Sequence, residues 1–158
     1  MKIFVGCDHA GFELKQKVMA ALPEIEWQDF GTLSKDSVDY PDFANKVCEK
    51  ITSVEIENKK KNIIDPLEGK VLGLLICGSG QGMAIRANRF PQVRAALCWN
   101  EEIVQLSREH NNANILCLGS RFVPAEQAVS MVKVFLQTKF EGGRHQGRVD
   151  KLSADTGC

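Results

Sequence analysis

Five short apolar runs alternate along the chain with longer segments in which apolar residues recur every three or four positions. The runs have the length of buried strands, and the longer segments have the period of helices packed on one face. The predicted strands cover residues 3–6, 25–30, 71–76, 94–98 and 115–118. Because strands that alternate with helices form parallel sheets with helical crossovers, the pattern predicts an α/β fold with a five-stranded parallel sheet.

The expected strand order is 2-1-3-4-5, which puts the switch point of the sheet between the first and third strands. Ligands of open α/β sheets bind at that point, beyond the carboxyl ends of the strands. Asp8 and His9 follow the first strand, and the segment 77–82 follows the third. The sequence therefore predicts a functional site built from these two strand ends.

The stretch 71–82 joins a buried strand to a thiol, three glycines and the start of a helix. Such a turn directs backbone N–H groups at the positive end of a helix dipole, which favours an anion. A dipole of this kind also favours the thiolate of Cys77. Ser79 is placed to donate a hydrogen bond to a developing oxyanion. A reactive thiol beside an anion-binding loop is the resulting hypothesis.

Two other interpretations of this stretch are open. Gly78, Gly80 and Gly82 do not have the spacing of a dinucleotide fingerprint, and they follow the third strand instead of the first, so nicotinamide binding is disfavoured. A cysteine at a strand end is also commonly a small buried hydrophobe, so Cys77 alone does not establish catalysis.

Composition narrows the class of protein. A length of 158 residues suits one domain, 1–158, in which the lysine-rich segment 55–69 is expected to be a surface insertion and 141–158 a basic, glycine-rich tail. The 20 basic and 20 acidic residues balance, which gives no reason to expect binding to nucleic acid or to a membrane surface. No apolar run is long enough to span a membrane, and the N-terminus enters a strand at once, so a cytoplasmic protein is expected. The six cysteines are expected to be free thiols, and no pair has the spacing of a zinc site.

Two further groups of residues have both a structural and a functional interpretation. His110 is expected at the end of a helix, where the dipole stabilises an imidazolium. Arg144 and Arg148 lie four residues apart, so one helical turn would direct both guanidiniums at a phosphate. A solvated basic tail is the alternative for the arginines, and the sequence alone favours it.

Seven segments of the chain, in order, match the motifs of a known family. They read GCDHAG at 6–11, DYP at 39–41, CGSGQG at 77–82, AN at 87–88, SREHN at 107–111, GSR at 119–121 and EGGRH at 141–145 with Arg148-Val149. Together they resemble ribose-5-phosphate isomerase type B, of the ribose and galactose isomerase family. The resemblance implies a Rossmann-like or flavodoxin-like three-layer sandwich and a homodimer with two sites at the subunit interface. It also implies isomerisation of a phosphorylated sugar with no cofactor and no metal.

The resemblance also implies a role for each motif residue. Cys77 would be the base that moves a proton between C1 and C2, and His110, from the partner subunit, would open the sugar ring. The enediolate would be stabilised by the loop residues Gly78, Ser79, Gly80, Gln81 and Gly82. Asp8, Tyr40 and Asn111 would contact the sugar. The phosphate would be held by His9 and by Arg121, Arg144 and Arg148, with the tail 141–158 completing that site.

Several alternatives stay open. The substrate could be a hexose 6-phosphate such as galactose or allose 6-phosphate, and the assembly a dimer or a tetramer. A non-catalytic phosphosugar-binding regulator and a cysteine hydrolase are the hypotheses from other classes. One branch of the family has a glutamate shortly after the glycine loop, where this chain has Met83, so the thiol branch is favoured. Many relatives have Asp at the position of Asn112, and the polar set around Trp99 differs, which leaves the preferred length of the sugar open.

Overall fold

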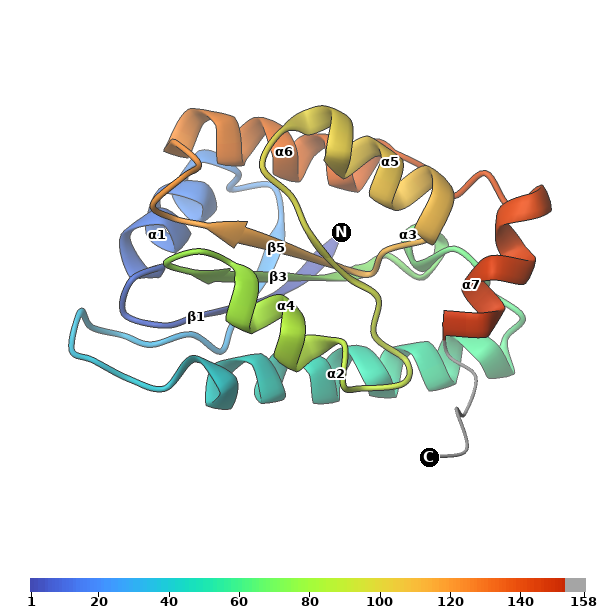
Figure 1. Cartoon of the computed structure of the whole chain (residues 1–158), viewed down its shortest axis with the longest axis horizontal. Coiled ribbons are helices and arrows are strands. Elements are labelled where there is room, and N and C mark those ends of the chain that lie inside the picture. The colour runs from blue at the N-terminus through green and yellow to red at the C-terminus, as the bar shows by residue number, and fades with distance from the viewer. Residues whose placement is uncertain (153–158) are drawn as a thin grey trace.

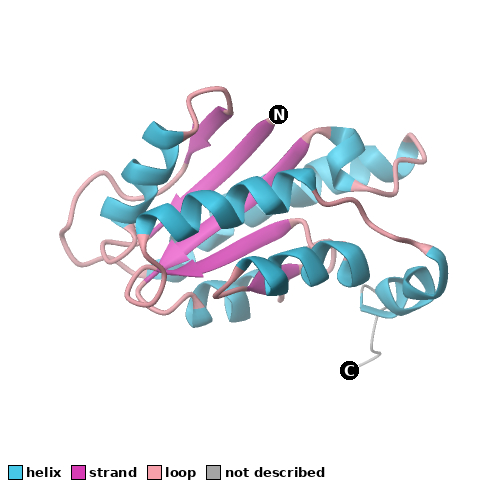
Figure 2. Cartoon of the chain, turned by 90° about the horizontal axis from the view of Figure 1, so that it is seen from above, coloured by secondary structure: helices cyan, strands magenta, loops and turns pink. Residues whose placement is uncertain are grey.

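A computed structural model describes residues 1–152 of the chain. Its centre is a sheet of five parallel strands, with helices on both faces (Figures 1 and 2). The strands are β1 (Lys2–Cys7), β2 (Glu26–Asp29), β3 (Val71–Cys77), β4 (Ala95–Leu97) and β5 (Ile115–Gly119). The predicted α/β three-layer fold is confirmed. The end of the tail, residues 153–158 with Cys158, lies outside the described residues.

The helices form two layers around the sheet. On one face lie α1 (Phe12–Ala21), α5 (Glu101–Asn111) and α6 (Ala125–Gln137), and on the other α2 (Tyr40–Lys60) and α4 (Gln81–Ala87). Three short elements complete the chain: α3 (Pro66–Gly69), the 3₁₀ turn η1 (Gly143–His145) and α7 (Gln146–Leu152). Asn100 caps the start of α5, because its side chain accepts a hydrogen bond from the Ile103 amide at 2.9 Å.

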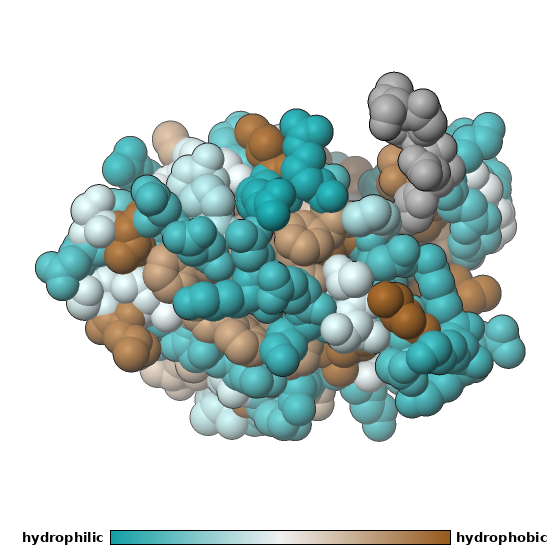
Figure 3. All heavy atoms as spheres, turned by 90° about the horizontal axis from the view of Figure 1, so that it is seen from below, coloured by the Kyte–Doolittle hydropathy of each residue, from teal (hydrophilic) through white to brown (hydrophobic). Residues whose placement is uncertain are grey.

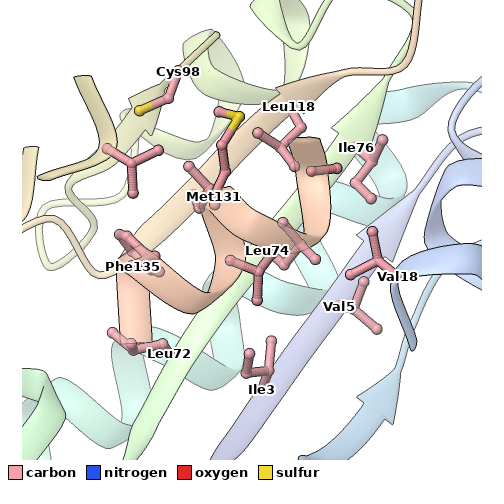
Figure 4. Packing of buried hydrophobic residues seen from close by; sticks show 14 of the residues in the cluster. Ile3, Val5, Val18, Leu72, Leu74, Ile76, Cys98, Leu118, Met131 and Phe135 are labelled. Carbon is pink, nitrogen blue, oxygen red and sulfur yellow. The ribbon is translucent and has the colours of Figure 1, made fainter. Parts of the chain in front are cut away.

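Each face of the sheet has its own apolar core. Ile3, Val5, Leu72, Leu74 and Ile76 point to one side, where they pack on α1 and α6 (Figure 4). On the opposite side the strands contribute another set, Phe4, Leu75, Cys77, Ile115 and Cys117, which packs on α2 and α4. Strands buried on both faces explain why the sequence shows continuous apolar runs without an alternating pattern.

The expected strand order is wrong at one edge, because the observed order is β2-β1-β3-β5-β4. All five residues of β5 are buried, whereas β4 has three residues of intermediate exposure. The longer apolar strand therefore takes the inner position beside β3, and the short one takes the edge. As a consequence, the loop that follows β5 lies next to the loop that follows β3.

One side chain takes up backbone hydrogen-bonding groups on the free edge of β4, the outermost strand. The Asn88 amide group donates to the Ala95 carbonyl at 2.9 Å, and its carbonyl oxygen accepts from the Ala95 amide at 2.9 Å. These are the two hydrogen bonds that a neighbouring strand would make with Ala95.

The segment 55–69 is not wholly a surface excursion, and that part of the expectation is wrong. The first six residues, 55–60, continue α2, and Glu55, Asn58 and Asp65 are buried. Asp65 accepts a hydrogen bond from the fully buried Arg108 at 2.5 Å and another from the Phe140 amide at 2.9 Å. Burial lowers the pKa of the Arg108 guanidinium, and the neighbouring Asp65 carboxylate offsets only part of that lowering. The segment thus packs against α5 and the chain that follows α6.

The surface over α2 is mainly hydrophilic, with apolar side chains in small separate spots (Figure 3). Among the described residues, no helix is both long and apolar enough to cross a membrane.

Replacing Asp65 with Ala should lower the free energy of unfolding by about 3–5 kcal/mol, because it leaves the Arg108 charge buried without its partner. Urea denaturation followed by circular dichroism measures this loss. Glu57→Ala is the control, because the Glu57–Lys60 pair is exposed and such pairs contribute at most about 1 kcal/mol. Equal losses in the two variants would contradict the structural role of Asp65.

Candidate functional site

The carboxyl edge of the sheet brings together residues from three strand ends. Cys77 is the last residue of β3, and its carbonyl accepts a hydrogen bond from the Ser120 amide, just after β5, at 2.9 Å. The Ser120 hydroxyl donates to the Ala10 carbonyl, after β1, at 2.8 Å. This network places the predicted site segments, from the first and third strands, beside the Gly119–Arg121 loop.

The thiol of Cys77 faces the turn that follows it. Its Sγ accepts a hydrogen bond from the Gly80 amide at 3.1 Å, and the residue is 4 % exposed. A backbone N–H thus points at the sulfur and fixes its position against the turn. The geometry suits a proton acceptor at the rim of a small turn.

The turn itself depends on glycine. Gly80 has a φ of +76°, and a Cβ there would lie 2.5 Å from Leu97 Cδ1. Gly119 of the neighbouring loop allows an equally close approach, since its Cβ would lie 2.7 Å from the Ser79 carbonyl oxygen. The Ser79 hydroxyl accepts from the Gln81 amide at 3.3 Å and is exposed. The following helix α4 is only seven residues long, so most of the N–H groups for an anion come from the turn.

Asp8 and His9 are held in fixed orientations. Asp8 is buried, and its Oδ1 accepts from the Gly11 amide at 3.0 Å. Nδ1 of His9 accepts from the Val38 amide at 3.2 Å, which leaves the Nε2 atom of a neutral ring as the donor. The loop that contains Val38 is held in turn by the buried Lys15, whose Nζ donates to the Thr32 carbonyl at 2.9 Å.

The side chains of Tyr40 and Arg121 both pack against the glycine loop. A Cβ on Gly82 would lie 2.5 Å from Tyr40 Cζ, so the phenol ring packs directly on that glycine. A Cβ on Gly78 would lie 3.1 Å from Arg121 Nε, so the guanidinium lies beside the turn. A hollow of about 330 Å³ adjoins the same loop, with the exposed side chains of Trp99 and Phe122 in its lining.

The other thiols among the described residues are core side chains. Cys7, Cys48, Cys98 and Cys117 are buried and free of disulfides. Burial raises the pKa of Cys7 and of Cys98 to about 11 and that of Cys48 to about 12. These groups stay protonated near neutral pH, so they have none of the nucleophilic or basic character of a thiolate.

The remaining predicted site residues lie at the opposite edge of the sheet. His110 and Asn111 end α5, just before β5 begins, and Arg144 and Arg148 are exposed on η1 and α7. Figure 1 shows α7 and the end of α5 beside the edge of the sheet at which the strands begin. Gly73 pairs with Ile115 at the start of β5, and Cys77 pairs with Gly119 at its end. The seven-residue β3 therefore separates the two edges by roughly 20 Å. Within one chain the two groups of candidate residues therefore do not meet.

His110 belongs to a compact cluster with two residues of the tail. Its ring stacks on His145, with centroids 4.3 Å apart and an interplanar angle of 5°. Oε2 of Glu141 lies 4.0 Å from His110 Nε2 and 3.6 Å from His145 Nε2. Burial, together with the positive charge of His110 and Arg144, lowers the pKa of His145. The cluster therefore favours a neutral His145 beside an acidic group.

Sequence reasoning gave no role to Arg108, Lys15, Glu141 or His145. Arg108 and Lys15 are fully buried. Their burial was not expected, because a charged residue in a helix is normally exposed to solvent. Asn112, where many relatives have Asp, has a φ of 50°. Its side chain donates a hydrogen bond to the Ile64 carbonyl at 2.9 Å, which an aspartate could not do. One signal in the sequence does point to a buried Arg108: it lies four residues after the buried Val104, and therefore on the same face of α5.

Comparison with known proteins gives a consistent result. The sequence model of the family described as Ribose/Galactose Isomerase matches residues 3–152. The chain is 41% identical to ribose-5-phosphate isomerase B of Escherichia coli, over 97% of this chain and 95% of that protein. It is similar to the solved ribose-5-phosphate isomerase B of Clostridium thermocellum, with a TM-score of 0.84, 42% identity and coverage of 97% and 95% of the two chains. A structure of the Mycoplasma genitalium enzyme with bound ribulose-5-phosphate matches with a TM-score of 0.82, 40% identity and coverage of 96% and 93%.

Gly80→Ala should lower the free energy of unfolding by about 1–3 kcal/mol, because an alanine is strained at this φ and its Cβ meets Leu97. Gly147→Ala is the matched control: its Cβ would have no neighbour within 4 Å, and alanine suits the helix α7. Denaturant unfolding of both variants tests the prediction. A Gly80→Ala variant as stable as the control would show that the turn tolerates a side chain.

Proposed function

This chain belongs to the ribose/galactose isomerase family, and we propose that it interconverts ribose 5-phosphate and ribulose 5-phosphate. The observation that carries the proposal is the likeness, over nearly the whole chain, to an enzyme solved with ribulose-5-phosphate bound. The chain is an isomerase, and its own residues suggest how it performs the reaction.

Cys77 is the proposed base. Isomerisation moves a proton between C1 and C2 of the open-chain sugar, and an enediolate forms when the weakly acidic C–H bond is broken. Its negative charge has to be stabilised as it develops. The Gly78–Gly82 turn offers backbone N–H groups and the Ser79 hydroxyl beside the thiol. The buried Asp8 is the proposed contact for the sugar hydroxyls.

His110 is the proposed group for ring opening, and it acts in the site of a partner subunit. Ribose 5-phosphate is mostly a closed furanose, whose ring oxygen must take up a proton as the ring opens. The His110 of one chain lies at the sheet edge opposite to its own Cys77. A second copy with its amino edge against this carboxyl edge would bring the two groups together, which supports a homodimer with shared sites. Asn111 would accompany His110.

The phosphate is proposed to lie between the two groups of candidate residues. His9 and Arg121 would bind it from the chain that supplies Cys77, and Arg144 and Arg148 from the partner. Guanidinium groups suit phosphate because they donate two parallel hydrogen bonds. Since the phosphate does not react, its binding energy serves to orient the sugar over the thiol.

Cys77→Ala should lower kcat for ribose 5-phosphate by about 10²–10⁴-fold, because it removes the proton acceptor. Cys48→Ala is the matched control, since Cys48 is a core thiol on α2 that does not line the hollow beside the turn, and it should keep kcat within about threefold. A coupled assay with ribose 5-phosphate, galactose 6-phosphate and allose 6-phosphate measures both the reaction and the preferred chain length. Full activity of Cys77→Ala would refute the assigned base, and faster turnover of a hexose 6-phosphate would refute the assigned substrate.

Mixing two inactive variants should restore activity if the sites are shared. In a mixed dimer of Cys77→Ala and His110→Asn, one of the two sites combines an intact Cys77 with an intact His110. Random pairing makes half of the dimers mixed, so about a quarter of wild-type activity should return.

The chains are unfolded and refolded together for this test, and each variant refolded alone is the control. No recovery in the mixture, with mixed dimers present by native mass spectrometry, would place both groups in the site of one chain. His110→Asn alone should still exchange a C1 hydrogen of ribulose 5-phosphate with solvent deuterium, because that sugar is already acyclic.

A further inference from the structure

We propose that His110, Glu141 and His145 form a binding site for a transition-metal dication of the Zn²⁺ type, and that the bound cation inhibits the enzyme. Their ligand atoms, two imidazole nitrogens and one carboxylate oxygen, all lie within 4.8 Å of one another. The inhibitory part rests on the proposed role of His110 in ring opening. The binding part rests only on the cluster itself.

The spacing of the ligand atoms is close to that of a metal site. Bonds of about 2.0–2.1 Å at a tetrahedral ion leave about 3.3 Å between ligand atoms. The two distances from Glu141 Oε2, 3.6 and 4.0 Å, exceed this by less than 1 Å. Because the lone pairs of imidazole lie in the ring plane, the stacked rings must turn toward the carboxylate as the cation binds.

A backbone hydrogen bond holds the cluster in place, and one nitrogen of the buried His145 ring lacks a hydrogen-bond partner. The Glu141 amide donates to the Glu109 carbonyl at 3.1 Å, which ties the tail to α5. His145 is 4 % exposed, and its Nδ1 has no hydrogen-bond partner among the described residues. A buried imidazole without such a bond is able to present either nitrogen to a cation. Coordination would also satisfy a polar group that is otherwise costly to bury.

The donor set selects the class of cation. Two imidazoles and one carboxylate are the ligands of many zinc sites that keep a water in the fourth position. Mg²⁺ and Ca²⁺ prefer sites made of oxygen atoms, so they are poor competitors here. The carbonyl end of α5 adds negative potential near His110. Arg144 and Arg148 oppose a cation, so the affinity should be lower than that of a structural zinc site.

The cation would act by removing the imidazole that the reaction uses. A metal bound to His110 occupies the nitrogen lone pair, so the ring neither accepts nor delivers a proton at the furanose oxygen. Glu141 and His145 are outside the proposed catalytic set. They would therefore make His110 sensitive to a metal ion without contacting the sugar.

Isothermal titration of the whole protein with ZnCl₂ tests binding. Cys77→Ala should bind Zn²⁺ with the wild-type Kd, which separates this site from the thiol. Glu141→Gln and His145→Gln should each raise Kd by at least about tenfold, since loss of a ligand costs no less than loss of a supporting group. Glu109→Gln is the matched control. Glu109 lies beside His110 on α5, but its carboxylate accepts a hydrogen bond from Gln105 and is not part of the cluster. Glu141 is 54% exposed, so Glu141→Gln is informative even if His145→Gln does not fold.

The outcomes are distinguishable. Unchanged affinity in Glu141→Gln, or loss of binding in Cys77→Ala, overturns the site. In the activity assay, Zn²⁺ should inhibit the wild type reversibly, with EDTA restoring turnover, and the half-inhibiting concentration should rise at least about tenfold in Glu141→Gln. Binding without inhibition overturns the regulatory part alone. A protein that binds Zn²⁺ at the cluster but has no isomerase activity without metal would refute the proposed function and leave the site in place.

Discussion

The buried guanidinium of Arg108 holds together the end of the molecule that carries His110. Its nitrogens donate to the Asp65 carboxylate and to the carbonyls of Ala113 and Thr138. Asp65 in turn accepts from the Phe140 amide, at the start of the tail. Three segments far apart in sequence, at Asp65, 108–113 and 138–140, thus converge on one charge that is costly to bury unpaired. The position of the tail relative to α5, and with it the His110 cluster, follows from this contact.

The direction of the strands decides which groups one chain can bring together. In a parallel sheet every strand ends at the same edge, so residues that follow strands gather there, and residues that precede strands gather at the other. Cys77 and Arg121 are of the first kind, and His110 is of the second. A longer linker or a different rotamer does not remove a separation of a full strand length. The proposed sharing of sites between two copies is therefore a consequence of topology.

The sequence was sufficient for the parts of the fold that depend on local pattern. The buried strands, the Asn100 cap and the glycine turn after Cys77 follow from periodicity and residue type. The order of β4 and β5 was not predictable in this way, because it depends on which of two short runs buries more area against β3. The roles of Arg108 and His145 were also missed, since each depends on partners more than 25 residues away, Asp65 and His110. The separation of His110 from Cys77, by contrast, could have been predicted from the sequence, because one residue precedes a parallel strand and the other ends one.

The side chain of Asn88 has a consequence for how this protein behaves at high concentration. A sheet edge with free N–H and C=O groups is a template on which another chain can add a strand and start aggregation. Asn88 occupies both groups of Ala95, the first residue of an edge strand only three residues long. An incoming strand would have to displace these two bonds before it made any of its own. The Asn88 side chain thus protects this edge against aggregation, in a molecule whose proposed activity requires a specific dimer.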